Sequence, residues 1–508
     1  CTTFKDTIDI IQQNNDDNTA LILAIQNNKN EKVIQYLCAT FKNNININKQ
    51  NNNGNTAFML AAMINTNIEV IQFLYNTFKS TLDVHTQDNK GNTAFMLAVR
   101  YSNVEMVQFI YQNYKDTIDL KKQNNVGETA FILAAQGTNV AVIQFIYETF
   151  IKDKIDINKQ DYCGNTAFMV AVWKSNIDMI QFLYDTFKHS ADFHKQNKNG
   201  DNAFTLAAQN TNVKAIQFIC NTFKNTIDVN KKNNNGDTAF TLAAQNTNVE
   251  IITFLYNKYH NTININYKNN ENNTAFMLAV FKSNVKVIQF IYEKYKDTIN
   301  IKEKNNNGNT VFMLAAQNTN VEVIKFLYDT FKDTIDINTQ NYNGDTAFML
   351  AALDTNVYII QFVHKTFKDK IVISLQNNNG NTAFMLAAQN TNVEVIQYLY
   401  FVLKDTMATN MQKQNKDGNT AFMLAAQNTN VEIIKYLCDT FKDKIDFFKQ
   451  NKDGNTLFML AAQNTNVEVI QYLYDTFNTN IDTNTQNKDG NTAFMLAAQN
   501  TNVEVIQY

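Results

Sequence analysis

Histidine side chains are the first candidates for chemistry in this chain, because imidazole binds metals and transfers protons near neutral pH. The chain has five of them, at His85, His189, His194, His260 and His364. Only His189 and His194 lie near one another in the sequence, and one such pair supplies too few ligands for a metal site. No HExxH or CxxC motif, phosphate-binding glycine loop or nucleophile–base set accompanies them. We therefore predict no enzymatic activity, no catalytic residue, no metal and no cofactor.

Cysteine thiols are the second candidates, since they can pair, bind metals or act as nucleophiles. Four of them, Cys1, Cys38, Cys220 and Cys438, recur at one position of a repeated sequence, and Cys163 falls in a turn. Equivalent positions in neighbouring packed helices lie about 10 Å apart, whereas a disulfide needs Cα atoms within about 7 Å. The cysteines are therefore interpreted as unpaired thiols, which indicates a reducing intracellular compartment, the cytoplasm.

Charge and hydropathy argue against nucleic-acid and membrane partners. The net charge is −3, and Arg100 is the only arginine. Arginine is the side chain that most often binds phosphates and base edges through two hydrogen bonds, so the chain is poorly suited to bind nucleic acid. No apolar run approaches the twenty residues of a membrane span. The many Tyr and Phe residues recur at helical spacing, which favours a packed core over base stacking. The excess of Asn, Lys, Ile, Phe and Tyr is typical of an organism with an A/T-rich genome.

One sequence organises the whole chain. The nineteen residues from Gly490 to Tyr508 are identical to those from Gly380 to Tyr398. Counting near and degenerate copies, the repeat begins near positions 17, 54, 91, 127, 164, 200, 236, 272, 308, 344, 380, 418, 454 and 490. Nine of the thirteen spacings are 36 residues, three are 37 and one is 38. A fixed period of this length indicates a repeat array, and we expect residues 1–508 to form a single solenoid.

Each repeat predicts two helices. Thr456 is an expected N-cap for a short helix over 457–462, and Asn464 is expected to end that helix in the left-handed conformation. Asn466 is the expected N-cap of a second, amphipathic helix that runs to about Phe477. An extended passage then leads to a turn in which Gly454 and its equivalents take a positive φ. The corresponding caps and turn of the last copy are Thr492, Asn502 and Gly490.

These residues resemble the ankyrin repeat, whose pattern is roughly D-x-x-G-x-T-P-L-H-x-A-A followed by E-V-V and D-V-N. The resemblance covers the entire chain; one copy reads Asn451–Ala462, then Val467–Ile470, then Ile481-Asp482. It implies an all-α, ankyrin-type helix–turn–helix solenoid with extended loop turns. Ala, as at Ala493, replaces the family's Pro in most copies, and Met replaces its His in ten copies. We expect an apolar methionine contact in place of the family's Thr–His hydrogen bond.

Two functions remain open. The hypothesis that we favour is a structural scaffold, a long, spring-like superhelix or filament formed by repeat stacking, because the surface is repetitive. It predicts self-association, head-to-tail or lateral, and the candidate end-to-end interface residues are Cys1, Phe4, Leu496, Ile506 and Tyr508, since one missing residue would join end to start in register. The alternative, implied by the resemblance, is an adaptor or effector that binds other proteins on the concave ankyrin face.

Overall fold

A computed structural model describes most of the chain. The described residues are 9–27, 31–63, 68–150, 155–282, 285–354, 356–404, 411–428, 430–441, 444–499 and 502–507. The chain divides into two compact units, here called unit 1 (Cys1–Leu242 with Phe254–Thr262) and unit 2 (Ala243–Thr253 with Ile263–Tyr508). Each unit is described by itself.

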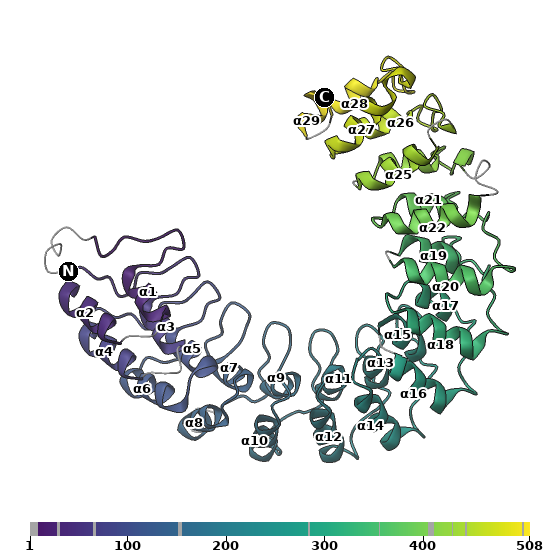
Figure 1. Cartoon of the computed structure of the whole chain (residues 1–508). Helices are drawn as coiled ribbons and strands as arrows, with labels where there is room; N and C mark the ends of the chain where they lie inside the picture. The colour runs from purple at the N-terminus through teal and green to yellow at the C-terminus, as the bar shows by residue number, and fades with distance from the viewer. Residues whose placement is uncertain are drawn as a thin grey trace. The chain divides into compact units, whose positions relative to one another are not determined.

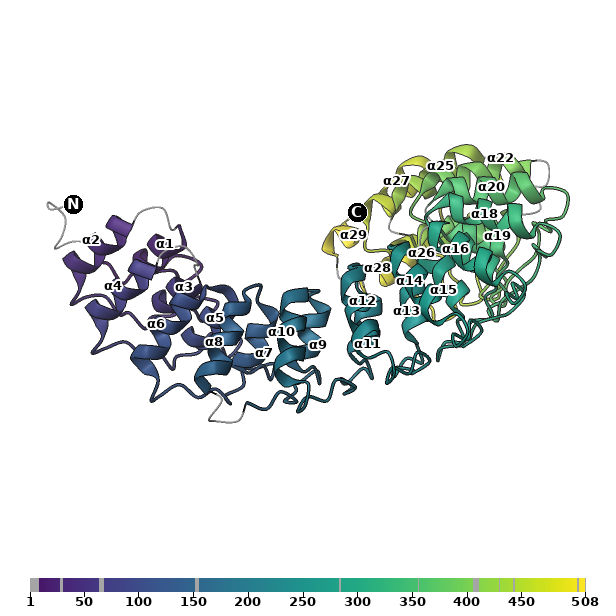
Figure 2. The same ribbon diagram turned by 90° about the horizontal axis from the view of Figure 1, so that it is seen from below.

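Unit 1 consists of helix pairs that form two rows. First helices pack on first helices and second helices on second helices (Figure 1), and the same rows can be followed from below in Figure 2. The first helices are α1 (Ala20–Gln26), α3 (Ala57–Met63), α5 (Ala94–Tyr101), α7 (Ala130–Gln136), α9 (Ala167–Trp173) and α11 (Ala203–Gln209). The second helices are α2 (Glu31–Phe41), α4 (Ile68–Phe78), α6 (Val104–Tyr114), α8 (Val140–Phe150), α10 (Ile177–Phe187) and α12 (Val213–Thr222).

Unit 2 repeats this plan, and the boundary between the units falls within the pair α13 (Ala239–Ala244) and α14 (Val249–Tyr259). Its other first helices are α15 (Ala275–Lys282), α17 (Val311–Ala316), α19 (Ala347–Leu353), α21 (Ala383–Ala388), α24 (Ala421–Ala426), α26 (Leu457–Ala462) and α28 (Ala493–Ala497). Its other second helices are α16 (Val285–Tyr295), α18 (Val321–Phe331), α20 (Val357–Phe367), α22 (Val393–Leu403), α25 (Val431–Phe441), α27 (Val467–Phe477) and α29 (Val503–Gln507). A short 3₁₀ helix, η4 (Asn478–Asn480), follows α27.

The two kinds of helix bury different amounts of their surface. In α27 the buried residues are Val469, Ile470, Leu473 and Phe477, which lie on one stripe at helical spacing. Every residue of α26 is buried, because this short helix packs between two neighbouring first helices and the second-helix row. The alanine pair at its end leaves room for that close approach, and α26 and α28 are in direct contact.

The N-caps differ in one detail from the sequence expectation. The methionine that replaces the family's histidine was expected to make only an apolar contact. In four described copies its Sδ atom lies 3.4 Å from the backbone N–H of the N-cap threonine, as in the pair Thr456 and Met459. Sulfur is a weak acceptor, so these methionines complete a weak form of the reciprocal capping box.

The expected left-handed end of the first helix is wrong. Among the residues that the structure describes, the only non-glycine residues with a positive φ are Asp17, Ser175 and Asn272, and Asn464 is not one of them. Its equivalent Gly137 has a φ of −70°. Asn464 instead donates from its side-chain amide to the backbone oxygens of Ala426 (2.8 Å) and Asn428 (2.7 Å) in the preceding repeat. The Asn464 side chain therefore links two neighbouring repeats, and its backbone does not adopt the left-handed conformation that we expected at the end of the helix.

Within the described ranges every regular element is a helix, and the elements alternate between short first helices and longer second helices. The predicted all-α helix–turn–helix stack is therefore confirmed. The expectation of one solenoid over residues 1–508 stays a prediction.

Candidate interaction surface

The capping residues named from the sequence lie at helix N-termini. The Thr456 hydroxyl accepts a hydrogen bond from the Met459 backbone N–H at 3.3 Å, and the Thr492 hydroxyl accepts one from the Met495 N–H at 3.4 Å. The Asn466 side chain accepts the Glu468 N–H at 3.0 Å. Its equivalent Asn502 accepts the Glu504 N–H at 3.1 Å and also donates to the Thr465 carbonyl of the preceding repeat at 2.9 Å. These side chains fix where each helix starts.

The turn glycines allow one repeat to lie against the next. Gly454 and Gly490 have φ values of +81° and +78°. A Cβ atom on Gly454 would lie 2.7 Å from the backbone nitrogen of Lys488, which donates a hydrogen bond to the Asp453 carbonyl at 2.9 Å. Glycine is needed here both for its backbone conformation and for this turn-to-turn contact.

A second link between turns, which we call the amide ladder, is made by asparagine side chains. In each rung the asparagine three residues before the turn glycine donates from Nδ2 to an Oδ1 atom just after the turn position of the preceding repeat, at 2.7–3.0 Å. Asp17 and Asn272 hold that turn position in two of the rungs, and glycine holds it in the others. The donors are Asn51, Asn124, Asn197, Asn233, Asn305, Asn341, Asn377, Asn415, Asn451 and Asn487. Their own Oδ1 atoms accept backbone N–H groups of the same turn, as Asn51 does from Asn53 and Asn55. Each such amide therefore uses its donor and its acceptor at once.

Two rungs of the ladder have a carboxylate where the donor should be. Asp88 accepts the backbone N–H groups of Lys90 and Asn92, but it has no proton to donate to the preceding repeat. The Asn55 Oδ1 atom, which should receive that proton, is buried and has no hydrogen-bond partner. Asp161 is the second case, and the acceptor position of the preceding repeat is held by another acid, Glu128.

The residue nine positions after the turn position lies at or just beyond the C-terminal end of each first helix, and we call these residues the inner row. Most of them are glutamine, as at Gln136, Gln209 and Gln463. The other members of the row are Met63, Arg100, Trp173, Phe281 and Leu353. Arg100 is the only arginine and Trp173 the only tryptophan of the chain. Trp173 is 49% exposed.

These unusual residues surround one groove of about 390 Å³ in unit 1. Its charged lining residues are Arg100, Glu128, Asp161, Lys174 and Asp201, and the Trp173 side chain also lines it. Glu128 and Asp201 are buried, and Asp161 is half-buried. The Arg100 Nη1 atom lies 4.0 Å from the Glu128 Oε2 atom. The sequence analysis identified Arg100 as the only arginine, but it did not align the repeats at this position, which would have placed Arg100 and Trp173 in the same row.

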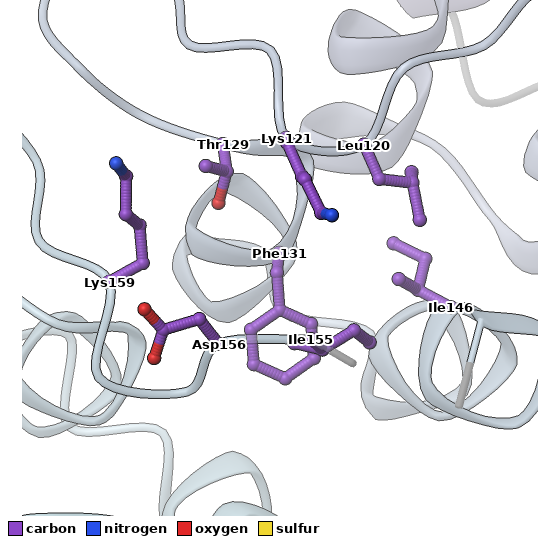
Figure 3. Close-up of a pocket in the computed structure, with 8 residues that line it drawn as sticks. All are labelled: Leu120, Lys121, Thr129, Phe131, Ile146, Ile155, Asp156 and Lys159. Atoms are coloured by element: carbon purple, nitrogen blue, oxygen red, sulfur yellow. The ribbon is translucent and has the colours of Figure 1, made fainter. Parts of the chain in front are cut away.

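A different space lies under a loop of unit 1 (Figure 3). It measures about 370 Å³, and Leu120, Phe131 and Ile155 are among its lining residues. The side chain of Phe150 and residues 151–154, which are nearby in the sequence, lie outside the described part of the chain. An equivalent space one repeat earlier, lined by Val84, measures about 250 Å³, and one two repeats later measures about 20 Å³ because Phe193 occupies the place of Leu120. We interpret this series as variable packing under the loops.

The cysteines and other ligand-type residues of the described part give no reactive cluster. Nowhere in the described ranges do three His, Cys, Asp or Glu side chains gather as a metal site would require. Cys38, Cys220 and Cys438 are buried, unpaired thiols, and Cys163 is exposed and unpaired. Burial raises the pKa of the Cys38 thiol to about 12 and that of Cys220 to about 11. Such thiols stay protonated at neutral pH and are poor nucleophiles.

The candidate end-to-end residues are only partly described. Cys1, Phe4 and Tyr508 lie outside the described residues. Leu496 is buried, with an exposed fraction of 3%, on α28, which packs on α26 and α29, and Ile506 is half-buried. Among the described residues of this repeat, the exposed apolar side chains are those of Phe494, Met495 and Val503.

None of the described helices has the length and apolar character that crossing a membrane requires.

Comparison with known families agrees with this architecture. The family model described as ankyrin repeats (3 copies) matches residues 39–121, 116–192, 185–269, 220–303, 259–341, 329–409, 367–446, 400–484 and 442–508. A comparison with curated proteins found no match. The matched ranges together span 39–508, and the helix pairs with their glycine turns follow the same period. The chain therefore belongs to the ankyrin repeat family.

Proposed function

We propose that this chain is a non-enzymatic scaffold that holds a partner protein on the inner row and turns of unit 1. Ankyrin repeats are in general protein-interaction modules. The observation that carries the proposal is the clustering of departures from the repeat: Arg100, Glu128 and Trp173 all line one groove. Tryptophan and arginine are the residue types most enriched at the energetic centres of protein interfaces.

The contrast with the last repeats of the inner row supports this choice. From Gly380 onward the row is uniform, with glutamine at Gln389, Gln427 and Gln463. A uniform row offers a partner the same contacts at every repeat, whereas the groove in unit 1 offers a combination that occurs once. Specific recognition needs such a difference in contacts between sites.

The test is photo-crosslinking from defined positions. A photoreactive amino acid at Gln136, which lines the groove, is expected to crosslink one protein in cells of the source organism. The same amino acid at the exposed Gln144 on α8 is the matched control and is expected to give no such product. Equal crosslinking from both positions, or none from several inner-row positions, would remove the proposal.

Self-assembly is the second candidate, in which the repeats form a long superhelix or filament that could act as a spring. The amide ladder favours it, because ten described rungs join an asparagine amide donor to an Asn or Asp Oδ1 acceptor, so a repeat from another copy could engage in the same way. We propose that such copies would meet through the repeat that contains α28 and α29. The chain itself and other proteins are thus the partner classes that we propose, and the scarcity of arginine supports neither DNA nor RNA as a partner.

Sedimentation and electron microscopy at increasing concentration test this candidate. Phe494→Lys combined with Val503→Lys is expected to lower assembly, because both side chains are exposed and apolar in that repeat. Tyr358→Lys, at an equally exposed position inside unit 2, is the control. A chain that stays monomeric at all concentrations would contradict self-assembly while leaving the partner-binding proposal intact.

A reducing, cytoplasmic compartment is also part of the proposal. The buried thiols Cys38, Cys220 and Cys438 support it, because none of them is paired. The expected result is cytosolic fractionation of the tagged chain, with all thiols in the reduced state when cells are lysed in an alkylating agent.

A further inference from the structure

We infer that the groove in unit 1 receives one arginine side chain of a partner protein, held between the carboxylates of Glu128 and Asp161 and against the Trp173 ring. The inference rests on the proposed function, because it names what the partner presents to this surface. The expected partner is a protein segment with an exposed arginine. The experiment distinguishes this segment from an acidic or a neutral one.

The rung between Glu128 and Asp161 has acceptors on both sides. In ten other rungs an asparagine amide donates across this gap. Here both positions are carboxylates, which accept hydrogen bonds and cannot donate when ionised. Asp161 accepts the Asn165 backbone N–H at Oδ1 (2.8 Å) and the Asn165 side-chain Nδ2 at Oδ2 (3.3 Å). Glu128 Oε2 accepts from Asn124 Nδ2 at 2.9 Å. All of these bonds stay within one repeat, and none of them links the Glu128 repeat to the Asp161 repeat. A cationic group with several donors would restore the missing link between the two repeats.

A second observation points to a missing donor at the same place. The Gln136 side chain donates to the Glu128 Oε1 atom, and its own Oε1 atom is buried without a hydrogen-bond partner. Gln136 lines the groove together with Glu128 and Asp161. A buried acceptor without a donor is unfavourable, so a ligand that brings an N–H group to the Gln136 Oε1 atom would gain a hydrogen bond that the unbound groove lacks.

The aromatic wall of the groove suits a guanidinium group. Trp173 lines the same groove and keeps 49% of its surface exposed. Its backbone is fixed by Asn210, which donates to the Trp173 carbonyl at 2.6 Å. Indole is the strongest cation–π partner among side chains, and the planar guanidinium group can stack on it while its edge donates to carboxylates.

The cations already present do not satisfy the groove. Arg100 forms one long ion pair, 4.0 Å from Nη1 to Glu128 Oε2, which is beyond hydrogen-bond distance, and its guanidinium carbon lies 5.2 Å from the centre of the Tyr101 ring. Lys174 is exposed. Three carboxylates, those of Glu128, Asp161 and Asp201, face these two cations among the lining residues. Charge complementarity therefore favours a cationic occupant.

The test measures the fluorescence emission of Trp173, which is the only tryptophan of the chain, so the whole tryptophan signal comes from the groove. The probes are four blocked peptides of glycine and serine with a central arginine, lysine, citrulline or aspartate. The arginine peptide is expected to change the emission and to bind about tenfold more tightly than the citrulline peptide, which has the same shape without the charge. Lysine is expected to fall between them, because it lacks the bidentate fork.

Two variants test whether a loss of peptide binding comes from the groove itself or from a change in the fold. Asp161→Asn restores the residue type found in most other rungs, so it is expected to keep the fold while weakening the arginine peptide about tenfold or more. Asp345→Asn changes a ladder carboxylate in unit 2, where Asp345 accepts from Asn377 at 2.7 Å, and is the matched control with no expected effect on binding.

Equal binding of the arginine and citrulline peptides, or unchanged binding in Asp161→Asn, would overturn the inference, as would preference for a peptide with central aspartate. Each of these results leaves the crosslinking from Gln136 as a separate readout. Crosslinking without arginine preference removes only the inference, whereas loss of crosslinking from the inner row removes the proposed function as well.

Discussion

An asparagine amide carries two donors and one acceptor oxygen on one short side chain, and each rung of the amide ladder depends on that combination. Asn451 shows the arrangement: its oxygen accepts the N–H groups of Asp453 and Asn455, and its nitrogen donates to Asn419 at 2.9 Å. Aspartate has nearly the same shape, but its carboxylate can only accept the N–H groups of its own turn and cannot donate to the preceding repeat. A change of one atom thus decides whether two repeats are linked at this position.

Asp88→Asn is expected to stabilise unit 1 by about 1 kcal/mol, because it would supply a donor to the buried, unpaired Asn55 Oδ1 atom. The gain is reduced by the loss of the contact between Asn92 Nδ2 and Asp88 Oδ2 at 3.0 Å. Urea unfolding followed by circular dichroism measures the difference. Asn124→Asp is the reverse change and should be destabilising, since it removes the 2.8 Å bond to Asn92. The same sign for both variants would show that the rung contributes little.

The buried thiols predict a loss of stability at alkaline pH. Burial raises the pKa of Cys220 from an ordinary value of 9.0 to about 11. The unfolded chain therefore loses this proton near pH 9, while the folded chain keeps it until about pH 11, so the free energy of unfolding falls between these two values. Urea midpoints measured across that range should fall less steeply for Cys220→Ala than for the native chain. Parallel slopes would mean that the thiol ionises equally in both states.

At the scale of the element, the first helices cannot be stable by themselves. Most of them have six or seven residues, well short of the twelve to fifteen or so at which an isolated helix becomes marginal. They persist because threonine caps start them and because they are packed on several sides by buried side chains. Leu460 and Leu473 show this packing in α26 and α27, with exposed fractions of 2% and 0%.

Leu473→Ala is expected to lower the stability of its region by about 2–5 kcal/mol, as for other fully buried leucines. Lys488→Ala, at an exposed turn position of the next repeat, should stay within about 0.5 kcal/mol of the native chain. Chemical denaturation of both variants side by side checks the assignment of inside and outside, and comparable losses would contradict it.

The helix pairs could be predicted from the sequence because their signals are local. Thr456 and Asn466 cap helices through bonds within two or three residues, and the apolar stripe that ends at Phe477 lies on one helix. The role of Asn464 could not be read this way. Its partners are the carbonyls of Ala426 and Asn428, which are 36 to 38 residues away, and a left-handed helix end is what asparagine suggests when only its own repeat is considered.

The candidate site was not predicted from the sequence, for a related reason. Arg100, Glu128 and Trp173 come from three different repeats and meet only when the repeats are stacked. The period was known, so an alignment of the repeats could have shown that Arg100 and Trp173 share a position. The pairing of Glu128 with Asp161 could not have been found, because it depends on which turn position faces which across the ladder.

At the scale of the whole molecule, contacts are made between neighbouring repeats, so stability is a sum of repeat and interface terms. Asn451→Leu is expected to speed hydrogen exchange in α24, α26 and the turns between them, because it removes the rung to Asn419 and two turn bonds. Exchange in α3 and α5 of unit 1 should not change. Faster exchange throughout the chain would instead indicate one cooperative unit.

The ladder also affects how the length of the gene can change. Each typical repeat presents a donor type to the repeat before it and an acceptor type to the repeat after it, as Asn451 and Asn455 do. A repeat copied or deleted as a whole by unequal recombination therefore meets matching partners on both sides, whichever neighbours it acquires. The identical stretches Gly380–Tyr398 and Gly490–Tyr508 are what such copying would leave behind. A rung with a carboxylate at the donor position, such as Asp161 opposite Glu128, lacks this matching pair. A repeat next to such a rung cannot be exchanged for another without changing the contact, so we expect the repeats around the groove to be copied or deleted less freely than the others.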